Sequence, residues 1–258
     1  MPQTVPSAAG RRTSLVLATD LDGTFAGGTA DERARLQRAI AAIPESMLIY
    51  VTGRCVAATR ELMEEAGLPR PDVLIADVGT TVVDGADFAP IAEIETALGR
   101  NWPGAAPIRD RLDGVPGLAE QDVEAPRRVS YHVADGDVEG AAERAAERLE
   151  GLPVELVGSA GIYLDVLPAG VNKGTTLRRL LAWLRRPETD VVVAGDSLND
   201  LALFDTGLAG VAVGNCEPAL RERIDGRAHV YLADGHGAAG ILEALEHFGW
   251  TLEVTDGE

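Results

Sequence analysis

The stretch "SLVLATDLDGT", residues 14–24, begins with a short aliphatic run and ends in two aspartates and a glycine. A run that is apolar at successive positions is typical of a strand buried on both faces, as in a parallel sheet covered by helices. In open sheets of this kind, ligands gather at the carboxyl ends of the strands. The stretch therefore predicts a buried first strand that delivers Asp20 and Asp22 to a functional edge of a sheet.

The same rhythm of apolar strand and helix recurs along the chain. Further strands are expected at 47–54 ("MLIYVTGR"), 72–80 ("DVLIADVGT"), 190–196 ("DVVVAGD"), 210–215 ("GVAVGN") and 229–233 ("HVYLA"). Helical patterns follow at 55–67, 173–186, 199–206 and 237–249. Strands that alternate with helices predict an α/β fold whose core is a Rossmann-like, doubly wound parallel sheet.

The middle of the chain has a different pattern. Two helical stretches, around 90–100 and 138–150, accompany the segments "RRVSYHVADGD" and "GIYLDVLP". Both segments alternate apolar and polar residues with the period of a half-buried strand. This mixture is typical of an α+β insert. We therefore expect residues 1–84 and 168–258 to form the core domain, and residues 85–167 to form an α+β cap domain.

The charge and the cysteines limit the partners. The chain has 258 residues and a formal net charge of −18, which argues against nucleic acids and membranes, because both bind basic faces. A polar leader is expected at residues 1–12, and the apolar run "SLVLA" behind it is too short for a membrane span. With only Cys55 and Cys216 present, a disulfide framework is excluded. We expect a cytoplasmic monomer or weak homodimer with a small-molecule substrate.

Polar side chains mark the ends of the predicted strands and the start of one helix. They are Asp20, Asp22, Thr52, Asp196, Asn199 and Asp200, together with Lys173, the only lysine beside 22 arginines. Carboxylates that converge from separate strands repel one another unless a cation lies between them, and a hard divalent ion such as Mg²⁺ meets this need. We expect Asp20, the backbone carbonyl of Asp22, and Asp196 to hold Mg²⁺.

The other polar residues at this edge are not acids. Thr52, Lys173 and Asn199 supply a hydroxyl, an ammonium group and an amide, and Gly53 adds a backbone amide. Beside Mg²⁺, such groups predict a receptor for a phosphoryl group, whose transfer depends mostly on positioning and charge neutralisation. Gly23 lets the backbone approach phosphate oxygens closely.

These residues resemble the haloacid dehalogenase superfamily of phosphotransferases, over nearly the whole chain after residue 13. The four motifs of that superfamily appear in order as "DLDGT", "VTGR", the lysine of "NKG", and "GDSLND". The resemblance implies a role for each matching position. The nucleophile would be Asp20, the general acid and base Asp22, the phosphate ligands Thr52 and Lys173, the metal ligand Asp196, and the ordering residues Asn199 and Asp200.

The insert lies after the third strand, as in the superfamily class with the larger α+β cap, class IIB. The stretches "ADVGTTV", "RRVSYHV", "LDVLPAGVNKG" and "LEALEHFGW" are similar to the sucrose-phosphate phosphatase branch, which includes mannosylfructose-phosphate relatives. This resemblance implies a Mg²⁺-dependent phosphatase for sucrose-6-phosphate or a similar disaccharide or hexose phosphate. It also implies four candidate substrate contacts, namely Arg54, Asp77, Thr80 and Arg128.

Other functions remain open. A phosphosugar mutase of the phosphomannomutase type would need a second, cationic phosphate site in the insert. The arginines that could build it are Arg100, Arg109, Arg111, Arg127 and Arg128. A phosphatase of the mannosyl-3-phosphoglycerate type is a further enzymatic alternative, and a ligand-binding module without catalysis is the non-enzymatic one.

Some of the singled-out residues also have a purely structural interpretation. Thr52 could cap a helix over 53–65, and Asp200 could either bind the metal or orient the residues that do. Cys55 has no histidine in a recognisable relation to it, so we interpret it as a small helix residue. His132 is expected on a strand face.

Overall fold

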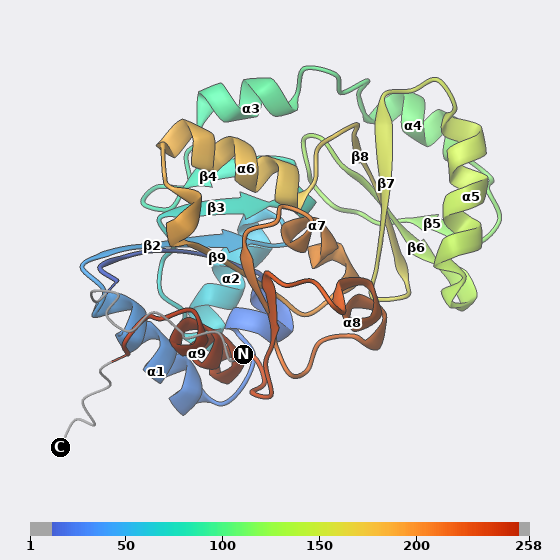
Figure 1. Cartoon of the computed structure of the whole chain (residues 1–258). Helices are drawn as coiled ribbons and strands as arrows, with labels where there is room; N and C mark the ends of the chain where they lie inside the picture. The colour runs from blue at the N-terminus through green and yellow to red at the C-terminus, as the bar shows by residue number, and fades with distance from the viewer. Residues whose placement is uncertain (1–11, 253–258) are drawn as a thin grey trace.

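A computed structural model describes residues 12–252 of the chain, so the predicted leader lies almost entirely outside the described residues. The larger part is a seven-stranded sheet with the order β11-β10-β9-β1-β2-β3-β4 (Figure 1). Its strands are β1 (Ser14–Thr19), β2 (Glu45–Val51), β3 (Val73–Ala76), β4 (Thr81–Asp84), β9 (Val191–Gly195), β10 (Ala209–Ala212) and β11 (Val230–Leu232). All neighbours pair in parallel except β3 and β4, which confirms the predicted α/β class.

Helices cover both faces of this sheet. On one face the buried core joins sheet residues to α1 (Ala30–Ala41), α2 (Val56–Ala66) and α9 (Ala238–His247). On the other face it joins them to α3 (Ala92–Leu98), α6 (Lys173–Leu184), α7 (Leu201–Phe204) and α8 (Pro218–Ile224). The sheet is therefore doubly wound, as predicted. Among the described residues, no helix has the length and apolar character that a membrane crossing needs.

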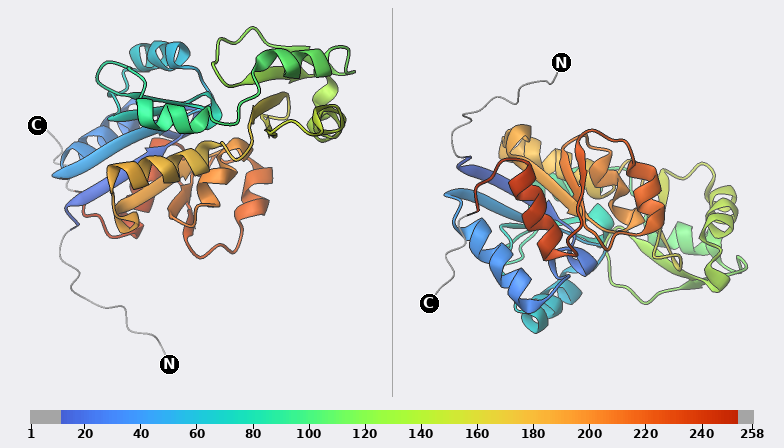
Figure 2. Two further views of the ribbon diagram at one scale, coloured as in Figure 1. Left: turned by 90° about the horizontal axis from the view of Figure 1, so that it is seen from above. Right: turned by 60° about the horizontal axis from the view of Figure 1, so that its bottom comes forward.

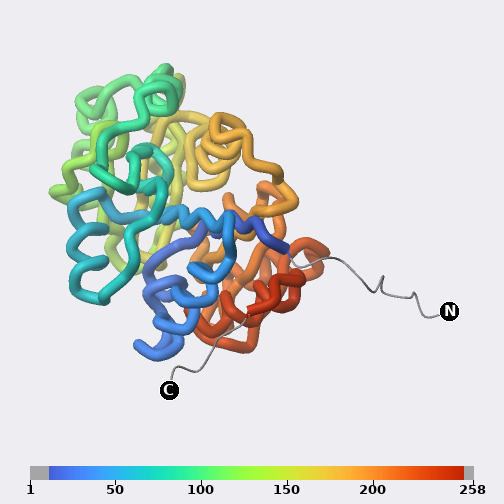
Figure 3. Tube along the Cα trace, turned by 90° about the vertical axis from the view of Figure 1, so that its left-hand side faces the viewer, coloured from blue at the N-terminus to red at the C-terminus, as the bar shows by residue number. Residues whose placement is uncertain are grey.

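The two ends of the described chain meet in the core. Figure 3 shows the blue and red segments grouped together, away from the green and yellow middle of the chain. The indole of Trp250 is 2% exposed and donates a hydrogen bond of 3.0 Å to the carbonyl of Ser14, at the start of β1. The last described segment therefore packs against the start of β1, a strand in the middle of the sheet.

The middle of the chain forms a second, smaller lobe (Figure 2). It contains an antiparallel sheet with the order β5-β6-β8-β7. Its elements are α4 (Ala105–Leu112), β5 (Leu118–Glu120), β6 (Val129–Val133), α5 (Val138–Leu149), β7 (Val154–Ser159) and β8 (Tyr163–Pro168). They share a separate apolar cluster around Ile108, Tyr131 and Ala145. We call this lobe the cap.

Several elements differ from the expected ones. The third strand ends at Ala76, four residues early, because a left-handed turn at residues 77–79 sends the chain back along β4. The helices α1, α4 and α8 and the strands β5 and β7 were not among the predicted elements. Helix α3 packs on the core through Ile94 and Leu98. The predicted boundary at residue 85 stays a prediction, and this packing favours a cap that begins after α3.

The strand register sets the position of the site. Thr19, the last residue of β1, lies level with Tyr50 of β2 and Ala194 of β9. The residues that follow these parallel strands therefore emerge at one edge of the sheet, where helix starts and strand ends meet.

Candidate active site

Three carboxylates stand close together at this edge. Oxygens of Asp20, Asp196 and Asp200 all lie within 4.8 Å of one another. Asp20 is 5% exposed and directly follows β1, and Asp196 directly follows β9. The hydroxyl of Thr24 donates a hydrogen bond of 2.8 Å to Oδ1 of Asp196. This cluster of acids is the kind of site that can hold a metal ion.

Lys173 lies fully buried against these acids. Its Nζ donates hydrogen bonds of 2.7 Å to Asp20, 2.7 Å to Asn199 and 2.6 Å to Asp200. Lys173 is the first residue of α6, whose start is fixed by a capping box between Asn172 and Thr175. An ammonium group has three protons, so all of its donors are used inside the protein.

Asp200 accepts hydrogen bonds from neighbouring protein groups through both of its carboxylate oxygens. Its Oδ1 accepts from Lys173, and its Oδ2 accepts from the backbone amides of Asp196 and Ser197 at 3.1 Å each. Both oxygens are therefore occupied by protein donors, and Asp200 is fully buried. The arrangement supports the orienting interpretation of Asp200 over direct metal binding.

The charges in this cluster do not balance. Burial, and after it the charge of Asp200, raise the pKa of Asp196 to about 6. Burial also raises the pKa of Asp20, against the lowering effect of Lys173. For Lys173, burial lowers the pKa, but Asp20 and Asp200 outweigh it and leave the pKa above its usual value. One ammonium group thus faces three carboxyls, an excess that a divalent cation would neutralise.

The turn after β1 brings the backbone against Asp196. Gly23 has φ +71°, and a Cβ at this position would lie 2.3 Å from Oδ2 of Asp196. Only glycine fits here, because a side chain would collide with the acid. The carbonyl of Gly23 accepts a hydrogen bond of 2.9 Å from Nδ2 of the Asn215 side chain, and this bond holds the turn in place.

The segment after β2 lies beside Asp20. Thr52 is fully buried, and its Oγ1 accepts a hydrogen bond of 3.2 Å from the backbone amide of Arg54. The predicted helix cap at Thr52 is wrong, because α2 begins at Val56 and Cys55 is its N-cap. Thr52 does not line the cavity described below, whereas Gly53 and Cys55 do. The phosphate-binding role of Thr52 stays a prediction.

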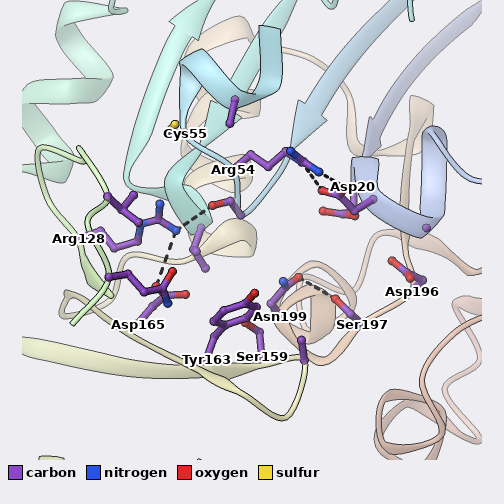
Figure 4. Close-up of a pocket in the computed structure, with 18 residues that line it drawn as sticks. Asp20, Arg54, Cys55, Arg128, Ser159, Tyr163, Asp165, Asp196, Ser197 and Asn199 are labelled. Carbon is purple, nitrogen blue, oxygen red and sulfur yellow. Dashed lines mark hydrogen bonds and ion pairs between the residues drawn. The ribbon is translucent and has the colours of Figure 1, made fainter. Parts of the chain in front are cut away.

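A cavity of about 630 Å³ lies between the core edge and the cap (Figure 4). The core contributes Asp20, Asp22, Gly23, Gly53, Arg54, Cys55, Ala58, Val78, Asp196, Ser197 and Asn199. The cap contributes Gln121, Val123, Arg128, Ser159, Ala160, Tyr163 and Asp165. Five of the predicted site residues, Asp20, Asp22, Gly53, Asp196 and Asn199, thus meet at one wall, whereas Thr52 and Lys173 are buried behind it, and a mixed polar and apolar surface of the cap forms the other wall.

The four predicted substrate contacts divide into two pairs. Arg54 and Arg128 line the cavity. Asp77 and Thr80 do not, and these residues are only 2% and 0% exposed. The turn at residues 77–79 buries them, and the Thr80 hydroxyl donates to the carbonyl of Asp77 at 2.9 Å. Their contact with substrate stays a prediction, and in this structure both residues lie behind the cavity wall.

The sequence interpretation missed most of the cap residues that line the cavity, including Ser159, Tyr163 and Asp165. One signal for them was present. In "YLDVLP" of β8, Asp165 stands between apolar residues of a strand that is otherwise buried, and such a polar residue calls for a partner or a ligand. His132, by contrast, lies where it was expected, on a strand face, with its ring 5.1 Å from that of Tyr163.

The fold and the site together define a phosphatase of the haloacid dehalogenase type. A family model described as sucrose-6F-phosphate phosphohydrolase matches residues 13–249. The chain therefore belongs to this family of phosphoric monoester hydrolases.

Three known proteins are similar to the chain. A glucosylglycerol-phosphate synthase from Pseudomonas anguilliseptica is 40% identical over 92% of this chain, which spans only 31% of the length of that synthase. A mannosylfructose-phosphate phosphatase from Agrobacterium fabrum is 31% identical, with 91% of this chain and 96% of the relative covered. The crystal structure of the sucrose-phosphatase from Synechocystis, in complex with sucrose and phosphate, is 31% identical with a TM-score of 0.84, covering 92% of this chain and 98% of that one.

Proposed function

We propose that the chain is a Mg²⁺-dependent sugar-phosphate phosphatase that works through an aspartyl phosphate on Asp20. The placement of Asp20 carries this proposal. Its Oδ1 is held by Lys173 at 2.7 Å, whereas its Oδ2 has no hydrogen-bond partner among residues 12–252, and the residue lines the cavity. A carboxylate with one oxygen fixed and the other open to a cavity is suited to attack phosphorus.

The residues at the strand ends fit a hard divalent cation. Asp20 and Asp196 each keep one carboxylate oxygen that no hydrogen bond occupies within the described residues. Oδ1 of Asp20, which Lys173 also contacts, the free oxygen of Asp196 and the backbone carbonyl of Asp22 would hold Mg²⁺, which supplies neutralisation of phosphoryl charge when bound. The raised pKa of Asp196, caused by burial and by Asp200, supports a cation site, because the charge of Lys173 offsets these effects only in part.

Three residues of the chain carry out the chemical steps that we propose. Oδ2 of Asp20 attacks phosphorus, and the bond to the sugar oxygen breaks while Asp22 gives that oxygen a proton. Asp22 next takes a proton from water, which attacks the acyl phosphate and releases inorganic phosphate. Lys173 holds Asp20 in place and reaches a phosphoryl oxygen by exchanging its bond to Asn199, which lines the cavity.

The cap side of the cavity favours a neutral group on the substrate. Arg54 and Arg128 are the arginines that line the cavity, and both already bind carboxylates, Asp22 in one case and Asp77 in the other. Arg109 and Arg127 bind Glu120 and Glu95 outside it. No arginine of residues 12–252 is thus left to hold a second phosphate or a carboxylate in the cavity, which argues against the mutase and the mannosyl-3-phosphoglycerate alternatives.

The size of the cavity suits a two-unit substrate. At about 630 Å³, it falls in the range of pockets that bury whole small ligands. We propose sucrose-6-phosphate or a similar glycoside phosphate as the substrate class. The relative with 40% identity adds a second candidate, a glucosylglycerol phosphate, since that synthase carries a segment similar to this chain.

A phosphate-release screen tests this function. The purified chain is incubated with sucrose-6-phosphate, mannosylfructose phosphate, glucosylglycerol phosphate and hexose phosphates, with Mg²⁺ or with a chelator. We expect Mg²⁺-dependent release of inorganic phosphate, fastest with one of the glycoside phosphates. Conversion of a hexose 1-phosphate to its 6-phosphate without phosphate release would instead establish a mutase.

A further inference from the structure

Arg128 joins the cap to the core. It stands just before β6 of the cap, and its side chain is 7% exposed. Its Nη1 donates a hydrogen bond of 2.8 Å to the carbonyl of Gly53, and its Nη2 donates one of 3.1 Å to Oδ1 of Asp77. Figure 4 shows the guanidinium reaching from the cap toward both the core segment and Asp165. One cap side chain thus contacts two core loops.

The same guanidinium also faces an acid of the cap. Oδ1 of Asp165, on β8, lies 3.7 Å from Nη1 of Arg128 and accepts a hydrogen bond of 2.5 Å from Ser130. Burial raises the pKa of Asp165 and of Asp77, and Arg128 offsets part of this effect in both. Two buried carboxyls from different lobes therefore share one positive charge.

The core residues that Arg128 contacts lie beside the proposed phosphate site. The backbone amides of Asp77 and Val78 donate to the carbonyls of Arg54 at 2.9 Å and Thr52 at 3.1 Å. Val78 has φ +58°, a left-handed conformation that a β-branched residue adopts only under constraint. The segment 52–54 is thus fixed from the core by this strained turn and from the cap by Arg128.

The polar groups of Arg128 and Asp165 are not fully used. Oδ2 of Asp165 has no hydrogen-bond partner among residues 12–252, and Asp165 lines the cavity. The Nε–H of Arg128 is buried, and no residue of the described range 12–252 accepts a hydrogen bond from it. Buried polar groups are almost always paired in folded proteins, so the Nε–H of Arg128 is an exception, and Oδ2 of Asp165 is free to accept a hydrogen bond from a ligand in the cavity.

We propose that Arg128 is a positioning residue that couples sugar binding to phosphate positioning, through Asp165 on one side and Gly53 on the other. A sugar hydroxyl donates to Oδ2 of Asp165, and Arg128, which faces the other oxygen, holds the segment 52–54 against the phosphoryl group. A correct sugar thereby favours the geometry needed for phosphoryl transfer, whereas a small phosphate ester does not. This inference rests on the proposed function.

Hydrogen exchange tests the bridge without any need for activity. In the free protein, Arg128→Ala should speed amide exchange several-fold or more in segment 52–54 and in β8, since fewer contacts hold them. Arg127→Ala is the matched control: Arg127 also joins cap to core, through the carbonyl of Thr80 at 2.9 Å, but does not line the cavity. Equal exchange of segment 52–54 in wild type and Arg128→Ala would overturn the bridge.

Kinetics with two substrates test the coupling. The best sugar phosphate from the screen is compared with p-nitrophenyl phosphate, which has no sugar. Asp165→Asn should raise KM for the sugar phosphate about tenfold and raise KM for the aryl ester by a smaller factor, because the aryl ester has no sugar hydroxyl for Asp165 to bind. Arg128→Ala should lower kcat for the sugar phosphate by about 10–10²-fold. The fall in kcat for the aryl ester should be smaller. Arg128→Lys should not restore kcat, because Arg128 reaches Gly53 and Asp77 from two separate nitrogens, and the single nitrogen of an ammonium group cannot occupy both positions.

The outcomes separate this inference from the proposed function. If the wild-type chain released phosphate from neither substrate, the proposed function would fail, and the exchange comparison would still decide the bridge. If Arg128→Ala lowered kcat equally for both esters, or if Arg128→Lys matched wild type, Arg128 would be a structural cation, and the coupling would be refuted.

Discussion

Arg54 donates two hydrogen bonds of 2.7 Å to Asp22, from Nε to Oδ2 and from Nη2 to Oδ1. The two residues follow different strands, β1 and β2, and both line the cavity. A planar guanidinium that binds both carboxylate oxygens fixes the plane as well as the position of the carboxyl group. The pair therefore orients the residue that we propose as general acid and base.

Loss of this pair should slow the reaction. We expect Arg54→Ala to lower kcat by about 10–10²-fold for every phosphate ester, because Asp22 is no longer held in line with the leaving oxygen. Arg54→Lys should recover only part of the rate, since an ammonium group cannot bind both oxygens in one plane. Steady-state kinetics measure the effect. Arg60→Ala, an exposed position on α2, serves as the control and should match wild type.

Substitution of Lys173 tests how large a cationic group the site can hold. Its Nζ has acceptors at 2.6–2.7 Å and no exposed surface, so a wider guanidinium has no room. Lys173→Arg should lower kcat by about 10²–10³-fold. Lys173→Met should also destabilise the fold by about 3–5 kcal/mol, because Asp20 and Asp200 stay buried without their cation.

The control for this pair lies on the same helix. Arg179→Lys exchanges the same two residue types at an exposed position of α6 and should leave rate and stability unchanged. Phosphate release and thermal unfolding are measured for all three variants. A fully active Lys173→Arg would show that the ammonium group has no special role.

Magnesium binding should depend on pH through Asp196. Burial and Asp200 raise the pKa of Asp196 to about 6 in the folded protein without metal. Between about pH 4 and about pH 6 the folded state therefore holds a proton that the unfolded chain releases, and this contribution to stability is lost as pH rises. A cation needs the ionised carboxylate, so the gain in stability from Mg²⁺ should grow as pH rises through about 6.

Thermal unfolding with and without Mg²⁺, from about pH 5 to about pH 8, measures this dependence. Asp196→Asn removes the titrating group and should abolish most of the stabilisation by Mg²⁺ at every pH. A Mg²⁺ effect in the wild-type chain that stays constant across the range would contradict Asp196 as a ligand.

Ala160 stands at the tip of the β7–β8 hairpin, where the cap meets the cavity. It has φ +50° and is followed by Gly161 at φ +65°, in a turn closed by a hydrogen bond of 3.2 Å from the amide of Ile162 to Ser159. Alanine is a poor residue for this left-handed position, which asparagine and glycine favour. The small side chain there leaves space in the cavity.

Two substitutions of Ala160 separate the effect of backbone strain on stability from the effect of side-chain size on substrate binding. Both Ala160→Asn and Ala160→Gly should relieve the backbone strain, and Ala160→Asn should raise the free energy of unfolding by about 0.5–1 kcal/mol. Only Ala160→Asn adds atoms to the cavity, so it should raise KM for the sugar phosphate while Ala160→Gly does not. Denaturant unfolding and kinetics check the pair, and equal KM values would place the Ala160 side chain outside the substrate site.

The sequence reveals the core of the site because its signals are local. Each apolar run ends where the strand ends, so the pattern of residues alone is enough to place Asp20 and Asp196 at one edge of the sheet. The lone lysine also lies against this cluster, in contact with Asp20 and Asp200. Its surroundings could not be predicted: Nζ is enclosed by Asp20, Asn199 and Asp200, so acylating reagents, which need an exposed amine, are a poor probe of Lys173 in the folded protein.

The cap residues could not be predicted in the same way. Which side of a cap strand faces the cavity depends on how the cap docks, and contacts such as Arg128 with Gly53 join positions 75 residues apart. The burial of Thr80 shows the same limit. It follows from the left-handed turn at Val78, a conformation that a β-branched residue gives no reason to expect.

The central claim is that phosphate passes through Asp20, and trapping that intermediate tests it most directly. The chain is mixed with Mg²⁺ and its best sugar phosphate, quenched in acid within the first turnovers, and reduced with borohydride, which converts an acyl phosphate to an alcohol. Peptide mass spectrometry should then find homoserine at position 20 in the wild-type chain and not in Asp20→Asn, which should also release no phosphate. Reduction at another carboxyl, or turnover by Asp20→Asn at the wild-type rate, would contradict the account.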